Sequence, residues 1–192
     1  DFEDFLAGFR SKRRREVRRQ RRRLAEAGYE VRLIEPAELS TYVAFAYDSY
    51  TRTIEKFSWG KQYLTRAFFD RLFSECAEDV RLFVAFDGAN EAVACALCLA
   101  DADTLYGRYW GATRMLRNLH FNVCYYAAVE HCIDYGLARF EPGAGGEYKQ
   151  VRGFDAQPTY SAHFLADPRL GAAVKRSLEA ERANAEETID WY

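Results

Sequence analysis

The stretch VRLFVAFDGANEAVACALCLADADTLYGRYW, residues 80–110, decides the fold. It contains three runs rich in β-branched, aromatic and other apolar residues, separated by the turn-forming Asp87-Gly88 and Asp101–Asp103. Turns of this kind join antiparallel neighbours. The sequence therefore predicts an antiparallel meander with strands at Val80–Phe86, Ala92–Ala100 and Thr104–Trp110.

On the N-terminal side of the meander, the pattern predicts one short strand and two helices. Tyr29–Ile34 alternates as a strand does, and Pro36 then suits a first helical turn. Apolar residues follow at helical spacing in two segments, the second across Gln62–Cys76. The expected core positions are Leu39, Tyr42, Val43, Ala46, Tyr50 and Ile54 in the first helix and Leu64, Phe68, Leu72 and Phe73 in the second.

On the C-terminal side, the pattern predicts a helix at Phe121–Tyr135, strands near Leu137–Phe140 and Thr159–Leu165, and a last helix. Asp167-Pro168 is typical of an N-cap followed by a first helical residue, so the last helix should run from there to about Glu187. The expected inward residues are Phe121, Cys124, Ala128 and Cys132 in the first helix and Leu170, Val174 and Leu178 in the last.

Length and composition favour one domain. A chain of 192 residues with 49% hydrophobic content can bury one sizeable core. No apolar run reaches the roughly 18–20 residues needed to cross a bilayer, and the acidic-aromatic, then basic, start does not resemble a signal peptide. Because the chain does not begin with Met, we expect a fragment or processed product of something longer.

The five cysteines indicate a reducing compartment rather than a disulfide or zinc site. Cys95 and Cys98 lie three apart in a predicted strand, on opposite faces, and no second Cys/His pair follows at ligand spacing. We therefore expect buried reduced thiols, no metal and a cytoplasmic location.

The net charge of −2 conceals a strongly basic N-terminal segment. Residues 1–28 hold ten Lys or Arg against five Asp or Glu, and all ten lie between Arg10 and Arg23, in a predicted helix. Five pairs of like charges occur at i,i+4 spacing, which destabilises a helix unless an anion lies against it. We expect a solvated linker helix or a site for RNA, a phosphorylated substrate or an anionic domain, with Arg13, Arg14 and Arg18 as candidate anion-binding residues.

The loop EPGAGGEYKQVRGF, residues 141–154, is the strongest candidate for chemistry. Its glycines give the backbone freedom, and Glu147, Lys149 and Arg152 place an acid, an amine and a guanidinium within six residues. The alternative is that these charges form ion pairs that hold a long loop in place.

The order of elements (strand, two helices, three-stranded meander, helix, strand) is that of the GNAT acyltransferase superfamily. We therefore expect an α+β, GNAT-like fold with a mostly antiparallel sheet flanked by helices, preceded by the basic helix at 1–28. Acetyl-CoA-binding members carry Arg/Gln-x-x-Gly-x-Gly/Ala before the next helix, so that backbone N–H groups hold the pyrophosphate. The nearest string, Arg108–Thr113, fails at its last position, and a standard CoA cradle is not expected.

Four strings carry a closer resemblance: LYGRYWGA (105–112), NLHFNVCYYAAVEHCIDYGL (118–137), FEPGAGGEYKQVRGF (140–154) and TYSAHFLADPR (159–169). In this order they resemble the FemAB-like family of N-acyltransferases linked to peptidoglycan biosynthesis or recognition in bacteria. Members are about twice this length and have two GNAT-like domains, and this chain resembles the C-terminal one, with the basic helix leading in from an N-terminal domain.

The resemblance implies transfer of an acyl or aminoacyl group to an amine, in cell-wall peptide synthesis. No resident cofactor is implied; the donor is a co-substrate, aminoacyl-tRNA or acyl-CoA. Lys149 and Arg152 are candidates for holding anionic groups or the oxyanion, and Glu147 for orienting or deprotonating the amine. His120 is a secondary catalytic candidate. Candidate substrate-binding residues are Arg108, Tyr109, Trp110, Asn122, Tyr126 and Tyr148.

The sequence departs from the family pattern at three of these positions. Asn122 stands where the family has Glu, and Gly145 and Tyr148 stand for Gln and His in the loop. Asn cannot act as a base, and Tyr titrates near pH 10 rather than near 6.5. Either the positions are structural in the family or the chemistry of this member differs.

Each candidate also has a structural interpretation. His120, His131 and His163 are more typical of structural histidines, and Tyr109, Trp110 and Tyr126 of core aromatics. Three function classes therefore remain: an N-acyltransferase, a nucleic-acid-binding module that uses the basic helix, and a silent recognition or scaffold domain.

Overall fold

A computed structural model describes residues 1–56, 61–143 and 147–191, and its contacts divide the chain into two compact units, Asp1–Ala144 and Gly145–Tyr192. In the described residues, no helix is long and apolar enough to span a membrane. The first unit contains a five-stranded sheet in the order β1-β2-β3-β4-β5. Its strands are β1 (Glu30–Ile34), β2 (Val80–Phe86), β3 (Ala92–Ala100), β4 (Thr104–Ala112) and β5 (Arg139–Glu141).

The sheet is antiparallel except at its last pair, where β5 runs parallel to β4. This confirms the predicted fold class and the meander, whose strands begin at the predicted residues. Asp87 stabilises the first turn by accepting the N–H groups of Ala89 and Glu91, and Asp101 accepts those of Asp103 and Thr104 in the second.

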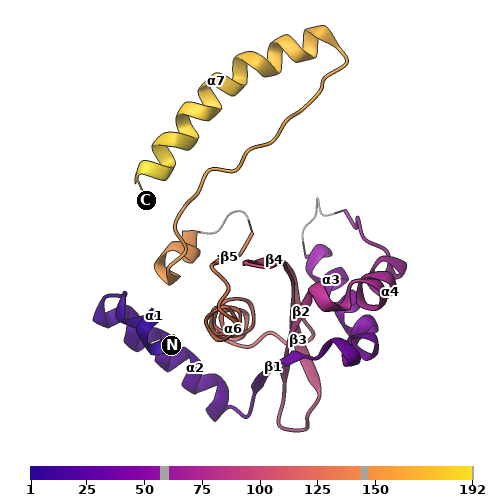
Figure 1. The fold of residues 1–192 in the computed structure, drawn as a ribbon, viewed down its shortest axis with the longest axis vertical. Helices are drawn as coiled ribbons and strands as arrows, with labels where there is room; N and C mark the ends of the chain where they lie inside the picture. Colours follow the sequence, from indigo (N-terminus) through magenta and orange to yellow (C-terminus); the bar gives the residue numbers. More distant parts are fainter. Residues whose placement is uncertain (57–60, 144–146, 192) are drawn as a thin grey trace. The chain divides into compact units, whose positions relative to one another are not determined.

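Helices cover both faces of the sheet (Figure 1). One face is covered by the 3-10 helix η1 (Pro36–Tyr42) and by α3 (Val43–Ile54) and α4 (Arg66–Glu75). The other is covered by α5 (Leu119–Phe121), the π-helix η3 (Asn122–Tyr126) and α6 (Ala127–Tyr135). A one-turn 3-10 helix η2 (Ala77–Asp79) leads into β2.

Two N-terminal helices, α1 (Phe2–Ala7) and α2 (Ser11–Glu26), pack on the α6 side. The predicted basic helix is therefore two helices, of which α2 carries nearly all the cations. It buries Val17, Gln20 and Leu24 within the first unit. The boundary predicted after residue 28 stays a prediction.

Alternation along the strands separates two cores. Cys95 belongs to the core under α3 and α4, and Cys98 to the core under α6, which confirms that they lie on opposite faces. All five cysteines are free, and Cys95, Cys98 and Cys132 are buried. Burial raises the pKa of Cys95 and Cys98 to about 12, so neither provides a thiolate at neutral pH.

Several predicted details of the first unit are wrong. The helix predicted at Gln62–Cys76 begins only at Arg66, because Thr65 caps it by accepting the N–H of Phe68. Its buried stripe is Phe69 and Phe73, whereas Phe68 is 41% exposed. The predicted Leu64, Leu72 and Phe73 do pack on this core, so the error is that Phe69 takes the place predicted for Phe68.

The second unit consists of a 3-10 helix η4 (Glu147–Arg152), an irregular segment and α7 (Pro168–Trp191). The strand predicted at Thr159–Leu165 is absent from this described segment, since alternation makes no strand without a partner. The predicted start of α7 is confirmed: Asp167 Oδ1 accepts the N–H groups of Arg169 and Leu170. Leu170 and Leu178, predicted inward, are exposed.

Candidate functional site

The candidate site is built around the outer edge of β4, beyond its pairing with β5. β4 pairs with β3 along its length, but with β5 only from Thr104 to Tyr106. At Gly107 the segment after β5 still lies against β4, since a Cβ there would lie 3.3 Å from the Cα of Pro142. In the described part of the chain, β4 has no strand partner on this side from Arg108 onward. The backbone oxygen of Trp110 accepts the Thr53 hydroxyl of α3 at 2.7 Å.

A β-bulge follows the end of this pairing. Leu97 pairs with Tyr109 and Cys98 with Gly107, which leaves Arg108 as the extra residue of β4. Bulges re-aim side chains and are frequent beside active sites. Arg108 is exposed, and its guanidinium lies 5.3 Å from the ring centroid of Tyr106.

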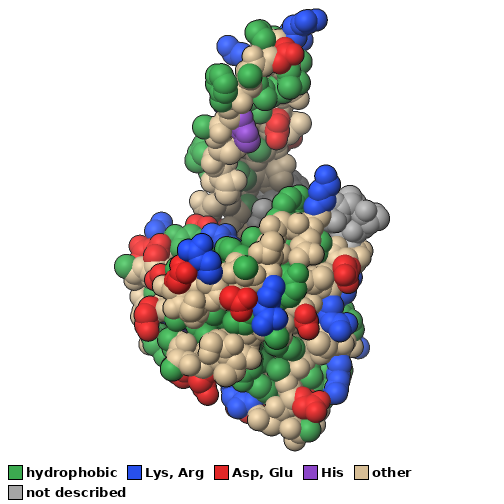
Figure 2. All heavy atoms as spheres, turned by 90° about the vertical axis from the view of Figure 1, so that its right-hand side faces the viewer, with side chains coloured by type: hydrophobic (Ala, Val, Ile, Leu, Met, Phe, Trp, Pro, Cys, Tyr) green, Lys and Arg blue, Asp and Glu red, His purple; other side chains and the backbone are tan. Residues whose placement is uncertain are grey.

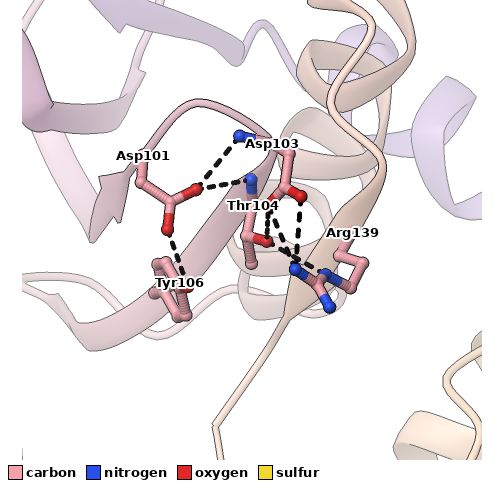
Figure 3. A network of polar contacts seen from close by, with 5 residues as sticks. All are labelled: Asp101, Asp103, Thr104, Tyr106 and Arg139. Atoms are coloured by element: carbon pink, nitrogen blue, oxygen red, sulfur yellow. Dashed lines mark hydrogen bonds and ion pairs between the residues drawn. The ribbon is translucent and has the colours of Figure 1, made fainter.

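A polar network holds β5 against the first residues of β4 (Figure 3). The Arg139 guanidinium donates to Asp103 Oδ1 at 3.2 Å and, from Nε, to Thr104 Oγ1 at 3.1 Å. The backbone oxygen of Asp103 accepts the N–H groups of Ala138 and Arg139. This network lowers the pKa of Asp103, through its bonds to Thr104 and Arg139, and fixes where the pairing starts.

The aromatic residues after the bulge point to opposite faces of the sheet. Tyr109 faces α3 and lies edge-on to Tyr50, with ring centroids 4.9 Å apart. Burial, and secondarily Tyr50, raises the pKa of Tyr109. Trp110 faces the α6 side, where its ring lies 4.6 Å from the His120 ring. Tyr109 is thus a core aromatic, whereas Trp110 and His120 lie together.

Gly111, in the string that came nearest to a CoA cradle, has a packing role. A Cβ at this position would lie 1.9 Å from the backbone oxygen of Ser49 in α3. The glycine therefore lets helix and strand approach closely, and it lies within β4 rather than in a phosphate-binding turn.

Asn122 and Tyr126 lie away from this edge, on the α2 side of the π-helix. Asn122 is buried, and its Nδ2 donates to the Asn118 oxygen at 2.9 Å. The Tyr126 hydroxyl donates to Gln20 Oε1 at 2.5 Å. Both residues line a cavity of about 380 Å³ between α2, β1 and α6, beside the Arg21–Glu130 ion pair. The substrate-binding residues predicted in the first unit therefore divide into two places.

In the second unit, Lys149 and Arg152 are buried, at 8% and 6% exposure, on η4. Arg152 Nη1 donates to the Tyr148 oxygen at 2.6 Å. Tyr148 is 43% exposed. Gly145 and the side chain of Glu147 lie outside what the structure describes, so the predicted role of Glu147 stays a prediction.

Each of the three predicted anion-binding arginines has a partner within the protein. Arg13 pairs with Glu16 at 2.9 Å, and Arg18 pairs with Glu3 of α1. Arg14 donates to the backbone oxygen of Phe9 at 2.8 Å. The Arg18 and Arg14 contacts join α2 to α1 and to the residues that follow it, whereas the Arg13–Glu16 pair lies within α2.

The other histidines do not join the candidate site at β4. His131 is buried on α6, stacked at 4.4 Å on Tyr135, which fits a structural role. His163 is exposed and contacts Ser161 Oγ at 2.9 Å. Among the described residues there is no group of three His, Cys, Asp or Glu side chains that could hold a metal ion.

Two site features were not predicted from the sequence. A glycine inside a strand signals a bulge, and Gly107 is such a signal beside Arg108. The π-helix at Asn122–Tyr126 has no comparable signal, although π-helical turns are frequent at functional sites.

A family model described as peptidoglycan biosynthesis/recognition matches residues 1–192. The chain belongs to the FemAB-like family. A search of curated proteins finds no match.

Solved structures give this FemAB-like chain the fold of acetyltransferases. One neighbour, a possible acetyltransferase from Clostridium difficile 630, has a TM-score of 0.52 at 13% identity, over 72% of this chain and 99% of that one. Another is L-PGS from Bacillus licheniformis, with a TM-score of 0.54 at 11% identity over 72% of this chain. The match covers only 44% of L-PGS. Family and fold together support an acyltransferase role related to the cell wall.

Proposed function

We propose that this chain transfers an acyl or aminoacyl group from an activated ester or thioester to an amine of a peptidoglycan precursor. The observations that carry the proposal are the end of the β4–β5 pairing at Tyr106 and the bulge at Arg108, in a chain whose residues 1–192 match the FemAB-like family. The backbone of β4 beyond its pairing with β5, apart from the Trp110 oxygen that Thr53 occupies, can hydrogen-bond an extended, amide-containing substrate as an additional strand would.

The reaction needs few protein groups. The neutral amine attacks the carbonyl carbon, the bond to the leaving oxygen or sulfur breaks, and the proton lost by the amine goes to a base and then to the leaving group. Proximity and stabilisation of the oxyanion supply most of the acceleration. A carboxylate or a neutral imidazole within reach of the amine serves as the base.

We assign roles within each unit. In the first unit, exposed Arg108 holds an anionic group of the substrate, Trp110 packs against it, and His120 is a candidate base. In the second unit, Lys149 and Arg152 hold anionic groups or the oxyanion, Tyr148 contacts the substrate, and Glu147 orients the amine. Asn122 has a structural role, because its amide bonds a backbone oxygen. Tyr126 contributes to a binding cavity rather than to the transfer itself.

The first test is a thermal-shift titration with a panel of acyl-CoAs and with charged and uncharged tRNA. A ligand that binds only the folded state stabilises it by about 2.7 kcal/mol at a hundredfold excess over its Kd. A shift with aminoacyl-tRNA but not with acyl-CoA agrees with the missing CoA cradle. A shift with acyl-CoA identifies a thioester donor instead.

The second test separates catalysis from recognition. Arg108→Ala should weaken donor binding at least tenfold, whereas Arg71→Ala on α4, on the other face of the sheet, should leave it unchanged. Lys149→Ala should abolish transfer to an amine acceptor, as measured by mass spectrometry of the acceptor. If wild type binds a peptidoglycan precursor but transfers nothing to it with any donor, the chain is a recognition domain, the alternative that Asn122 favours.

A further inference from the structure

The cations of helix α2 fall into two groups. Those in the first group have partners within the protein: Arg13, Arg14, Arg18, Arg21 and Arg22. The second group is exposed and makes no side-chain hydrogen bond or ion pair to any residue that the structure describes: Lys12, Arg15, Arg19 and Arg23. We call these four residues the cationic stripe.

The cationic stripe lies on one side of the helix. At 100° per residue, its four members fall within about 80° of one another around the axis. From Lys12 to Arg23 they extend about 16 Å along it. The opposite side of the helix buries Val17 and Leu24 within the first unit, so the stripe faces outward. Figure 1 shows α2 at the outside of this unit, beyond α6.

Like charges lie side by side along the stripe, whereas the corresponding positions on another helix of the protein hold opposite charges. Arg15 and Arg19, and Arg19 and Arg23, are like charges at i,i+4. On α4 the same spacing holds the opposite pairs Arg66–Asp70 and Arg71–Glu75. The face of the first unit in Figure 2 mixes acidic, basic and hydrophobic side chains. An external anionic partner would relieve the repulsion along α2.

We propose that the cationic stripe docks the protein on an anionic lipid surface. Four cations in one row on a helix can contact a flat anionic surface together, and clusters of four to eight Lys or Arg on a helix are typical of binding to anionic lipids. We expect electrostatic binding, since the large apolar side chains of α2, Val17 and Leu24, are buried. This docking is independent of the transfer reaction proposed above.

RNA fits the stripe less well. Residues 10–23 contain no aromatic residue on which a base could stack, which single-stranded sites use. Double-stranded RNA is contacted across two successive minor grooves and the phosphates between them, which is a wider surface than one row on one helix. Here Glu16 and Glu26 interrupt the positive charge beside the row. The observations therefore favour a plane of anionic headgroups over a polynucleotide.

The test is co-sedimentation of the full chain with vesicles of phosphatidylcholine alone and of an equimolar mixture with phosphatidylglycerol. The variant K12Q/R15Q/R19Q/R23Q keeps good helix formers. Its partitioning should fall about a thousandfold, on the order of fivefold for each cation lost. The control R52Q/K56Q/K61Q/R117Q removes four exposed cations of the same unit outside α2 and should keep wild-type binding.

Each outcome decides the proposal. Binding only to the anionic vesicles, weakened by salt and lost in the stripe variant but not in the control, supports it. Equal loss in both variants, or none in the stripe variant, overturns it. Failure of wild type to bind the vesicles also overturns it, and binding of uncharged tRNA in that case would assign the stripe to RNA. The stripe variant should melt no lower than wild type, since two repulsive pairs are removed.

Discussion

The two faces of the sheet are packed by different means. On the α3 side, aromatic and aliphatic residues close the core, and helix and strand approach so closely at Gly111 that no side chain fits between them. On the α6 side, the covering helix contains a π-helical turn with the buried polar residue Asn122, an imidazole at His131 and a cavity toward α2.

This difference separates support from binding. The α3 face tolerates no change in separation, so it holds β4 in place, and the bulge at Arg108 re-aims the next side chains. The α6 face carries Trp110 and His120 and the polar groups that a substrate can meet. Substitutions on the α3 face should therefore lower the free energy of unfolding most. Those on the α6 face should lower it less, through the loss of polar contacts.

The largest effect is expected at Gly111 on the α3 face. Gly111→Ala places a Cβ against the Ser49 backbone, which forces α3 away from β4 and costs about 3 kcal/mol of the free energy of unfolding. Urea denaturation measures it. Gly8→Ala, where the Cβ would lie 3.5 Å from its nearest neighbour, is the control and should stay within about 0.5 kcal/mol of wild type. Equal stability of the two variants would show that the close approach does not exist.

On the α6 face, Asn122→Ala should cost about 1 kcal/mol, because the buried side chain and its hydrogen bond to the Asn118 oxygen are lost, while the backbone N–H of residue 122 still bonds that oxygen. Asn122→Asp should cost at least as much at neutral pH, because a carboxylate cannot donate this bond. Urea denaturation of both variants is the measurement. A more stable Asp variant would mean that the acid found here in the family is also structurally preferred in this chain.

The edge where both faces meet is tested at Thr104, which is fully buried. Thr104→Val removes the acceptor for Arg139 Nε and the donor to Asp103, at a cost of about 1 kcal/mol. Because β5 is then held less firmly, hydrogen exchange at the N–H groups of Ala138 and Arg139 should accelerate. Thr51→Val, which loses a bond within α3, should leave that exchange unchanged. Unchanged exchange at Ala138 and Arg139 in Thr104→Val would show that the polar network does not hold β5 in place.

Sequence reasoning succeeded where one local pattern and one packing surface agree. The meander follows from alternation and turn residues alone, and it was predicted to the residue at each strand start. It failed where tertiary contacts choose between close alternatives. Phe68 and Phe69 are equally apolar, and only the phase of α4 on the sheet decides that Phe69 is buried.

The candidate site was predictable in part for the same reason. Arg108, Trp110 and His120 follow from the position of β4 and the helix after it. Asn122 and Tyr126 were expected beside them, but their direction depends on the turns of η3, which no periodicity in the sequence reveals. Glu147, Lys149 and Arg152 lie on a glycine-rich connection, where backbone freedom leaves the geometry to tertiary contacts.

The smallest effect, a dependence of stability on pH, should distinguish the α6 face. Burial first, and the nearby Arg81 second, lower the pKa of His131, while Asp134 opposes them. The unfolded chain, with a pKa of about 6.5, therefore binds a proton that the folded protein excludes, and stability rises with pH through this window. His131 thus stabilises the fold fully above about pH 6.5, and this contribution is lost as the pH falls toward the lowered folded value.

The variant His131→Phe keeps an aromatic ring beside Tyr135 and Phe83. Measured by urea unfolding, it should lose less stability than wild type between about pH 7.5 and 5. His163→Gln, at an exposed position, should follow wild type. If the free energy of unfolding of wild type and His131→Phe depends on pH in the same way, His131 takes up no proton on unfolding, and the two faces of the sheet do not differ in this respect.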